Sequence, residues 1–168
     1  VLGETIGHDK NPNKIQMDEI FGMGGDDIIV AGAAIDKLKG GEGNDTIWGG
    51  SNDGARPNEF AGDTAWYSGS EARYNVIQNV YVKAVDAQGA KNENGSVERN
   101  AEGLVKVYRS ADDTEVLKAK GIADSGTVAA DQLIESNGYF EAVLVVDSLA
   151  ESQGGEGTDV LIGIEGLM

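Results

Sequence analysis

Aspartate recurs at nine-residue intervals in the first third of the sequence. When residues 13–66 are divided into six consecutive blocks of nine, aspartate takes the sixth position of five blocks. These aspartates are Asp18, Asp27, Asp36, Asp45 and Asp63. Carboxylates at a fixed spacing suit a hard cation, because calcium takes about six to eight oxygen ligands from carboxylates and backbone carbonyls. The spacing therefore indicates an array of cation-binding turns.

Glycine precedes the aspartate in the best blocks, and a large aliphatic residue follows it. The fourth block, Gly40–Trp48 (GGEGNDTIW), fits the pattern G-G-x-G-x-D-x-U-x at every defined position. The second block (GMGGDDIIV) departs from this pattern only at Met23. Glycine accepts φ > 0 without a Cβ clash, so the first part of each block can form a turn with inward carbonyls. The rest of each block is then a short strand whose apolar eighth residue points inward.

These blocks resemble the nonapeptide repeats of the RTX (repeats-in-toxin) family, also called hemolysin-type calcium-binding repeats. The resemblance covers residues 13–66 and implies a parallel β-roll, in which two nonapeptides make one coil and calcium binds between stacked turns. The fifth block (GGSNDGARP) departs most, because Gly54 takes the sixth position and Arg56 the eighth. A further match, GGEGTDVLI at Gly154–Ile162, lies far from the array. A lone turn there could complete a calcium site only if it packed beside the main array.

Turns 18 residues apart are expected to stack on one side of such a roll. Asp27, Asp45 and Asp63 would then share one flank, and Asp18, Asp36 and Asp53 the other. We expect ordered calcium mainly on the first flank, because its turns are rich in glycine, and one degraded site on the second. The candidate ligand residues of the first flank are Gly22, Gly24, Asp26, Asp27, Gly40, Glu42, Asp45 and Asp63. Those of the second flank are Asp18, Asp36 and Asp53.

The rest of the chain, residues 67–168, has less glycine and more strand-like alternation. Strands are expected at Tyr74–Val85, Leu104–Arg109, Glu115–Lys120, Glu141–Val146 and Val160–Leu167. A short helix is expected at Thr127–Ser136, with Thr127 as its N-cap and Gly138 just past its end.

The predicted fold is therefore all-β. A lead-in (residues 1–12) precedes a short parallel β-roll of nonapeptide repeats (13–66), which a capping antiparallel β-sandwich or curved sheet (67–168) follows. An open roll needs such a cap because its end exposes strand edges and apolar side chains. Phe60, Trp66 and Tyr67 stand at the expected junction.

Composition excludes several classes of function. The 168 residues carry a net charge of −16, which argues against a nucleic acid or an anionic membrane surface as the partner. Cysteine is absent and His8 is the one histidine. The sequence therefore argues against a zinc-thiolate site, which needs cysteine, and against a catalytic triad, which needs a histidine base. The apolar runs are too short to insert into a membrane. We expect a non-catalytic chain whose partner is calcium.

The leading hypothesis is a calcium-loaded module of a large extracellular bacterial protein. The resemblance implies export by type I secretion, calcium-triggered folding outside the cell, and a role as a scaffold or in an adhesin. Two alternatives stay open: an accessory domain of a secreted enzyme, and a carbohydrate- or cell-surface-binding module that uses Tyr81, Tyr108 or Tyr139. The ends of the sequence carry no targeting features, so we expect a piece of a longer host polypeptide.

Overall fold

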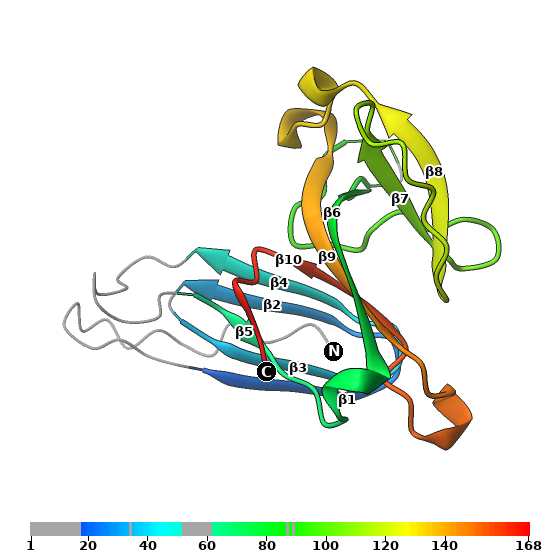
Figure 1. The fold of residues 1–168 in the computed structure, drawn as a ribbon. Coiled ribbons are helices and arrows are strands. Elements are labelled where there is room, and N and C mark those ends of the chain that lie inside the picture. Colours follow the sequence, from blue (N-terminus) through cyan, green and yellow to red (C-terminus); the bar gives the residue numbers. More distant parts are fainter. Residues whose placement is uncertain (1–17, 34, 52–61, 87, 89) are drawn as a thin grey trace.

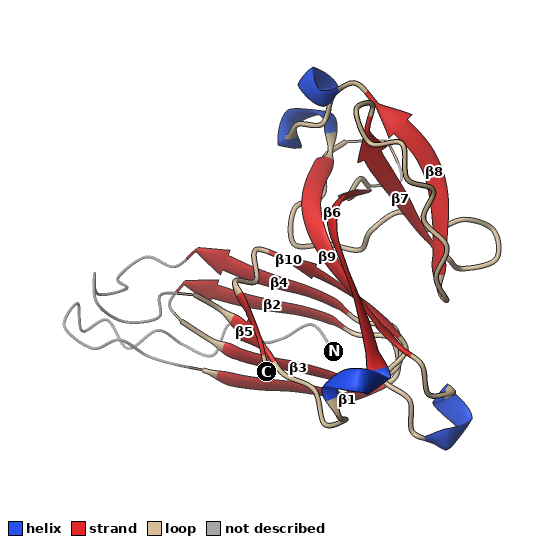
Figure 2. Cartoon of the chain, viewed as in Figure 1, coloured by secondary structure: helices blue, strands red, loops and turns tan. Residues whose placement is uncertain are grey.

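The structure, a computed structural model, describes residues 18–33, 35–51, 62–86, 88 and 90–168. This part of the chain contains eleven strands, which form two sheets (Figure 1). Its helices are four single 3₁₀ turns at the periphery (Figure 2). They are Glu71–Arg73, Ala130–Gln132, Glu135–Asn137 and Glu151–Gln153. The all-β fold expected from the sequence is confirmed.

The first two coils of the roll have the predicted nonapeptide register. Their strands are β1 (Glu19–Gly24), β2 (Ile28–Ala33), β3 (Lys37–Glu42) and β4 (Thr46–Ser51). β1 pairs in parallel with β3, and β2 pairs in parallel with β4, and both pairs join residues 18 positions apart. Two nonapeptides therefore make one coil.

The third coil is built from two distant segments of the chain. On one side, β5 (Thr64–Ala65) pairs with β3, and on the other side β10 (Thr158–Ile162) pairs in parallel with β4. A final strand, β11 (Gly166–Leu167), then pairs with β5. The isolated nonapeptide Gly154–Ile162 thus packs beside the main array. Residues 67–153 are called the insertion below.

The register between β3 and β5 differs from the repeat. Lys37 lies opposite Thr64, 27 positions later, so no strand from the fifth block lies between β3 and β5. The sequence of that block explains the jump, because it would place the charged Arg56 at the inward-facing position and Pro57, which has no N–H, within a strand. The chain therefore skips one nonapeptide before it rejoins the roll.

The insertion extends one sheet of the roll. Its strands are β6 (Tyr74–Lys83), β7 (Val105–Ser110), β8 (Ile122–Val128) and β9 (Tyr139–Asp147). The sheet order is β2-β4-β10-β9-β6-β7-β8, and β9 lies antiparallel to both β10 and β6. The continuous sheet bends, so the insertion rises from the roll at an angle (Figure 1). Three of the expected strands, now β6, β7 and β9, are confirmed.

Other local predictions were wrong. Glu115–Lys120 is not a strand, and β8 pairs in parallel with β7 instead. The expected helix at Thr127–Ser136 is absent because Thr127 belongs to β8, and two 3₁₀ turns follow this strand. Gly138 does end the second of these turns, at φ 84°. The expected strand Val160–Leu167 divides into β10 and β11 at Gly163, whose φ is 67°.

Two hydrophobic cores hold these parts together. The roll's own core contains the inward-facing eighth residues of the nonapeptides, as the repeat predicts. They are Ile20, Ile29, Leu38, Ile47, Ala65 and Leu161. The second core lies between the outer face of the roll and the insertion, where the rings of Trp48 and Phe140 meet edge to face at 4.9 Å. The insertion therefore covers one outer face of the roll.

The expected junction residues have different surroundings. Trp66 is half-buried and contacts Phe21 edge to face at 5.7 Å, whereas Tyr67 packs against the roll core. Phe60 lies outside the described residues. None of the helices in the described part of the chain is long and apolar enough to cross a membrane.

Candidate metal centre

Stacked turns bring acidic residues into two ladders, one on each side of the roll. In both ladders, the backbone N–H of one acidic residue donates a hydrogen bond to the carboxylate of the next. In the first ladder, the Asp27 N–H donates to Asp45 Oδ1 at 2.9 Å, and the Asp45 N–H donates to Asp159 Oδ1 at 2.9 Å. The ladder thus continues from the repeat array into the distant nonapeptide.

The second ladder lies on the opposite side of the roll. The Asp18 N–H donates to Asp36 Oδ1 at 3.0 Å, and the Asp36 N–H donates to Asp63 Oδ1 at 2.8 Å. The Asp63 N–H then donates to Glu165 Oε2 at 2.7 Å. Each carboxylate therefore fixes the backbone of the neighbouring coil.

The predicted membership of the flanks was wrong for one residue. Asp63 was expected beside Asp27 and Asp45, but it follows Asp36 because the chain skips one nonapeptide before β5. Asp159 takes the expected place of Asp63. Asp53, expected on the second flank, lies outside the described residues.

The carboxylates of the first ladder are removed from water. Asp45 and Asp159 are fully buried, and Asp27 is 7% exposed. Burial raises the pKa of Asp45 from 3.8 to about 7, and the negative charges of Asp27 and Asp26 raise it as well. Burial and the charge of Asp45 raise the pKa of Asp159 well above its usual value. Such a stack of acids requires protons or a cation to offset its mutual repulsion.

Asp147 shows how this protein compensates a buried carboxylate without a metal ion. Burial alone would raise its pKa, but hydrogen bonds from the Arg73 guanidinium and from the amides of Leu149 and Glu156 lower the pKa to about 2. Asp45 Oδ2, in contrast, is a buried oxygen with no hydrogen-bond partner in the described part of the protein. A buried and unsatisfied carboxylate oxygen is the expected signature of a missing positive partner.

The first glycine of each turn makes room for this oxygen. A Cβ atom at Gly40 would lie 2.0 Å from Asp45 Oδ2, so no other residue type fits there without displacing the carboxylate. At Gly22, a Cβ atom would lie 2.8 Å from Asp27 Oδ2 and 2.5 Å from the carbonyl oxygen of Gly40. Carboxylate and carbonyl oxygens therefore converge beside the first glycine, and these are the donors that calcium prefers.

The other predicted ligand residues lie further out. Asp26 and Glu42 are exposed, and Asp26 Oδ1 accepts a hydrogen bond of 2.8 Å from the Asn44 N–H in the next turn. The Glu42 carbonyl accepts one of 2.8 Å from the Gly25 N–H. A Cβ at Gly24 would meet Glu42 only at 3.9 Å, so this glycine is outside the crowded part of the turn. These residues join one turn to the next.

Few side chains are placed to act together as ligands of one metal ion. Among the described residues, no three His, Cys, Asp or Glu side chains are grouped to hold one metal ion. A cation between two turns must therefore draw on backbone carbonyls as well as on the ladder carboxylates. This combination suits calcium, which accepts carbonyl oxygens in flexible geometry.

The third turn of the first ladder is anchored by residues that the sequence interpretation missed. The Tyr67 hydroxyl donates to Asp159 Oδ2 at 3.0 Å, and the Tyr74 hydroxyl donates to Glu156. Glu156 is buried, and its Oε1 lies 3.7 Å from Lys39 Nζ. The motif GGEGTDVLI was a signal for Glu156 and Asp159. Tyr67 was expected at the junction but not as a hydrogen-bond donor, and no sequence pattern pointed to Tyr74.

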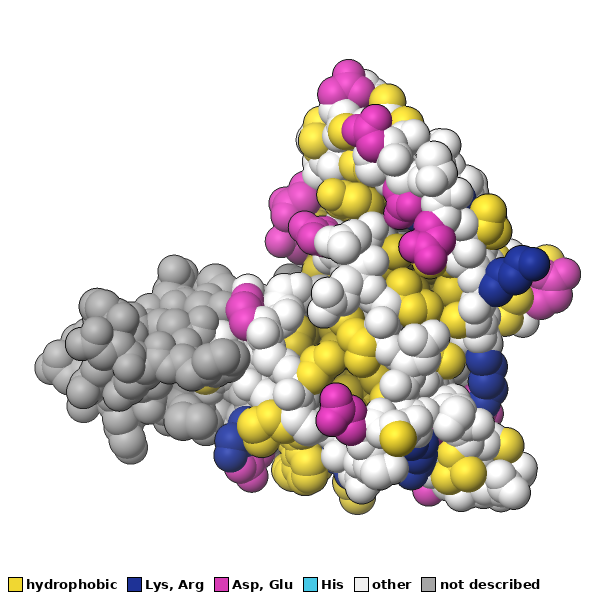
Figure 3. Space-filling view, in the orientation of Figure 1, with side chains coloured by type: hydrophobic (Ala, Val, Ile, Leu, Met, Phe, Trp, Pro, Cys, Tyr) yellow, Lys and Arg dark blue, Asp and Glu magenta, His cyan; other side chains and the backbone are white. Residues whose placement is uncertain are grey.

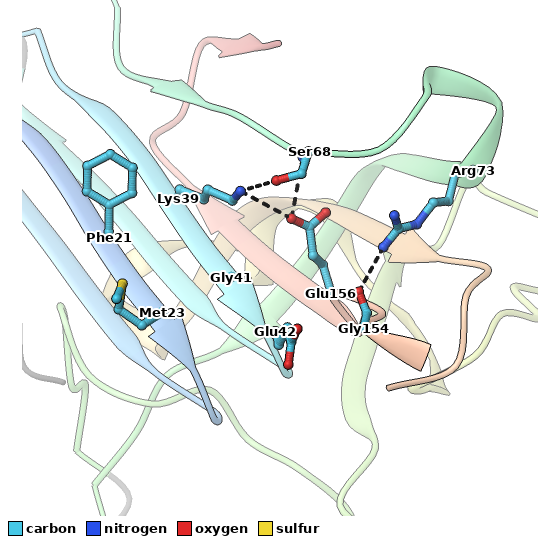
Figure 4. Close-up of a pocket in the computed structure, with 9 residues that line it drawn as sticks. All are labelled: Phe21, Met23, Lys39, Gly41, Glu42, Ser68, Arg73, Gly154 and Glu156. Carbon is cyan, nitrogen blue, oxygen red and sulfur yellow. Dashed lines mark hydrogen bonds and ion pairs between the residues drawn. The ribbon is translucent and has the colours of Figure 1, made fainter. Parts of the chain in front are cut away.

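A cavity of about 330 Å³ opens beside this anchor (Figure 4). Lys39 and Arg73 reach it from opposite sides, and Arg73 donates to the Gly154 carbonyl at 3.2 Å. Both cations already have acidic partners, since Lys39 pairs with Glu156 and Arg73 with Asp147. The cavity therefore lies between strands β1 and β3 of the roll on one side and the insertion and third turn on the other. A second hollow lies in the angle between the insertion and the roll (Figure 3).

Comparison with known proteins agrees with this geometry. Residues 18–54 match the family model of the RTX calcium-binding nonapeptide repeat, in four copies. This stretch contains β1 to β4, and RTX nonapeptide repeats bind calcium. A search of curated proteins and a search of solved structures gave no match. The third coil, with Asp63, Asp159 and Glu165, lies outside the matched residues.

Proposed function

We propose that this chain is a calcium-triggered folding module and rigid scaffold of a secreted bacterial protein, such as an adhesin exported by type I secretion. The first ladder is the observation that carries the proposal. It stacks Asp27, Asp45 and Asp159 out of water and leaves Asp45 Oδ2 with no hydrogen-bond partner in the described part of the chain. Calcium supplies the positive charge that makes such a stack favourable.

Different residues of the roll position the calcium ligands and form the hydrophobic core. The ladder amides hold each Asp Oδ1 in place, so that Oδ2 is the oxygen directed toward the first glycine of the turn. The eighth-position aliphatic residues form the core only when the coils stack, and stacking brings the acids together. Where calcium is scarce, repulsion between the acids therefore opposes core formation, whereas at millimolar calcium the free energy of binding becomes free energy of folding. The chain would stay unfolded during export and fold outside the cell.

A calcium titration of the whole chain followed by circular dichroism tests this function. Chelation should remove most of the β signal of the roll, and calcium at about millimolar concentration should restore it. Magnesium should restore it poorly, because it demands tight octahedral geometry and keeps its waters. A spectrum and a melting temperature that do not change after exhaustive chelation would refute the proposal.

A second candidate function is supported by one feature of the insertion. Tyr81 and Tyr108 lie directly opposite each other on β6 and β7, and Tyr139 meets Tyr108 edge to face at 5.2 Å. All three rings are half-buried and share one face of the sheet. Amphipathic rings on a sheet face can stack against sugar rings. A glycan array with the whole chain tests this role, and Tyr108→Ala should abolish any binding that it detects.

A further inference from the structure

The cavity of about 330 Å³ has an apolar wall on the side of β1. Phe21 and Met23 stand on this wall, and their side chains are 45% and 77% exposed (Figure 4). Ile20 packs against the roll core, so the alternation of the strand directs Phe21 outward. Apolar side chains that stay exposed beside a hollow commonly mark a binding site, and small-molecule sites have volumes of about 300–1,000 Å³. This cavity therefore suits one small ligand.

The rest of the lining carries polar groups with unused hydrogen-bonding capacity. Lys39 Nζ donates to Ser68 Oγ and lies 3.7 Å from Glu156 Oε1. Glu156 also accepts hydrogen bonds from the Ser68 N–H and the Tyr74 hydroxyl. A carboxylate has about four acceptor positions, so Glu156 can accept a further hydrogen bond. The Ser68 hydroxyl accepts from Lys39 but donates to no group in the described part of the protein, so it can donate to a ligand.

The charges around the cavity leave no excess of positive charge. Both cations that reach it, Lys39 and Arg73, are paired with carboxylates. Glu42 adds an exposed carboxylate at the end of β3. A Cβ atom at Gly154 would lie 3.6 Å from Glu42 Oε1, so this carboxylate reaches toward the third turn. Within the described residues it has no ion pair or hydrogen bond, so a ligand can use its oxygens.

The apolar wall and the polar groups together favour one class of ligand. An anion would need an excess of positive charge, and a purely apolar molecule would leave polar groups without partners. A sugar ring has an apolar face and a rim of hydroxyl groups that both donate and accept hydrogen bonds. We infer that the cavity binds a neutral sugar residue, whose ring packs against Phe21 and Met23. Its hydroxyl groups bond to Ser68, Glu42 and Glu156.

The cavity is assembled from parts that only the folded chain brings together. Phe21 and Glu42 belong to the repeats, Ser68 to the insertion and Glu156 to the third coil. Because calcium folds the roll in the proposed function, sugar binding should require calcium although the cavity contains none of the ladder aspartates. This requirement rests on the proposed function, whereas the site itself does not.

The cavity shares no residue with the tyrosine face of β6, β7 and β9, so the two surfaces are rival locations for sugar binding. A glycan array with the whole chain at about millimolar calcium provides the probe. Titration calorimetry with the best-retained neutral glycan then tests the site. Phe21→Ala should weaken binding by about tenfold, and Phe21→Tyr, which keeps the ring, should bind as the unsubstituted chain does. Glu42→Ala, at an exposed position, should weaken binding as well.

Tyr108→Ala removes a ring outside the cavity and is the matched control, so binding at the cavity should survive it. Circular dichroism in calcium checks that each variant folds. If the folded chain retains no neutral glycan, or if Tyr108→Ala abolishes binding while Phe21→Ala and Glu42→Ala do not weaken it, the inference is wrong and the proposed function stands. Binding that persists in a chelator would contradict the calcium requirement. A chain whose circular dichroism does not respond to calcium would refute the proposed function alone, and the variants would still test the site.

Discussion

The backbone N–H of Asp45 donates a hydrogen bond to the carboxylate of Asp159, a residue 114 positions later. Asp159 therefore occupies the place that the next repeat of an uninterrupted array would fill. The insertion leaves the roll after β5 and returns immediately before this nonapeptide. A roll of three coils thus closes only when the two ends of the insertion are held together, and the contacts of Tyr67, Tyr74 and Arg73 hold them.

The first prediction compares the two ladders. Asp45 lies between Asp27 and Asp159 in glycine-rich turns, whereas the turn of Asp36 (AGAAID) lacks the paired glycines. Asp45→Asn should therefore weaken calcium binding by at least about tenfold, or about 1.4 kcal/mol, and by more than Asp36→Asn. Titration calorimetry measures both. Equal losses would mean that calcium does not prefer the first ladder.

The second prediction concerns the pH dependence of the metal-free chain. The folded-state pKa of Asp45 is raised from 3.8 to about 7, as is that of Asp63, so the folded state binds more protons than the unfolded state between these values. The free energy of unfolding should therefore fall as pH rises through this window, and the loss should be complete above about pH 7. The metal-free chain should be more stable at about pH 5 than at about pH 8.

Circular dichroism in the presence of a chelator measures this pH effect, because protonation at about pH 5 should restore part of the β signal that chelation removes at about pH 8. Calcium competes with the protons, so its apparent affinity should rise over the same window. Asp45→Asn carries no titrating group at this position and should flatten the dependence. A metal-free chain that gains stability from pH 5 to pH 8 would contradict the assignment.

The sequence predicted the parts of the fold that depend on local pattern. Turn glycine, ladder aspartate and inward aliphatic residue all lie within one nonapeptide, so β1 to β4 and their register could be read from the spacing. The same pattern in Gly154–Ile162 indicated a turn and a strand. It could not show that Asp159 packs on Asp45, because that contact depends on the path of the insertion between them.

The errors in the prediction have physical causes. The position of Asp63 was wrong because one nonapeptide was assumed to fill each half-coil, although Arg56 and Pro57 are poor residues for an inward-facing strand. The strand β8 (IADSGTV) has no apolar alternation and is fixed by its pairing with β7. The hydrogen bonds of the Tyr67 and Tyr74 hydroxyl groups were missed because their acceptors lie more than 80 positions away in the sequence.

The third prediction concerns Met23, which stands where the repeat has glycine. Its φ is 83°, and Gly41, at the same position of the fourth block, has φ 108°. Left-handed backbone costs a non-glycine residue about 1–2 kcal/mol. Because the Met23 side chain is 77% exposed, its packing offsets little of this cost. Met23→Gly should stabilise the calcium-bound chain by about 1 kcal/mol in urea unfolding.

Gly41→Ala is the converse change and should destabilise the calcium-bound chain, because its Cβ would lie 2.1 Å from the Met23 carbonyl oxygen. A neutral or destabilising Met23→Gly would show that this conformation is not strained.

The fourth prediction concerns Tyr67, whose hydroxyl is the protein's own partner for Asp159 Oδ2. Tyr67→Phe keeps the ring in the roll core but leaves this buried oxygen without its donor, which should destabilise the chain by about 1–3 kcal/mol at the lowest calcium concentration that folds it. The loss should be smaller at saturating calcium, because a cation between the turns of Asp45 and Asp159 can take over the oxygen. Urea unfolding at this low calcium concentration and at saturating calcium measures the difference. Tyr81→Phe, which removes a hydroxyl from a half-buried ring on the insertion, is the matched control and should have little effect in either condition. If Tyr67→Phe costs the same at both calcium concentrations, no cation reaches the third turn, and calcium binding on this side ends at Asp45.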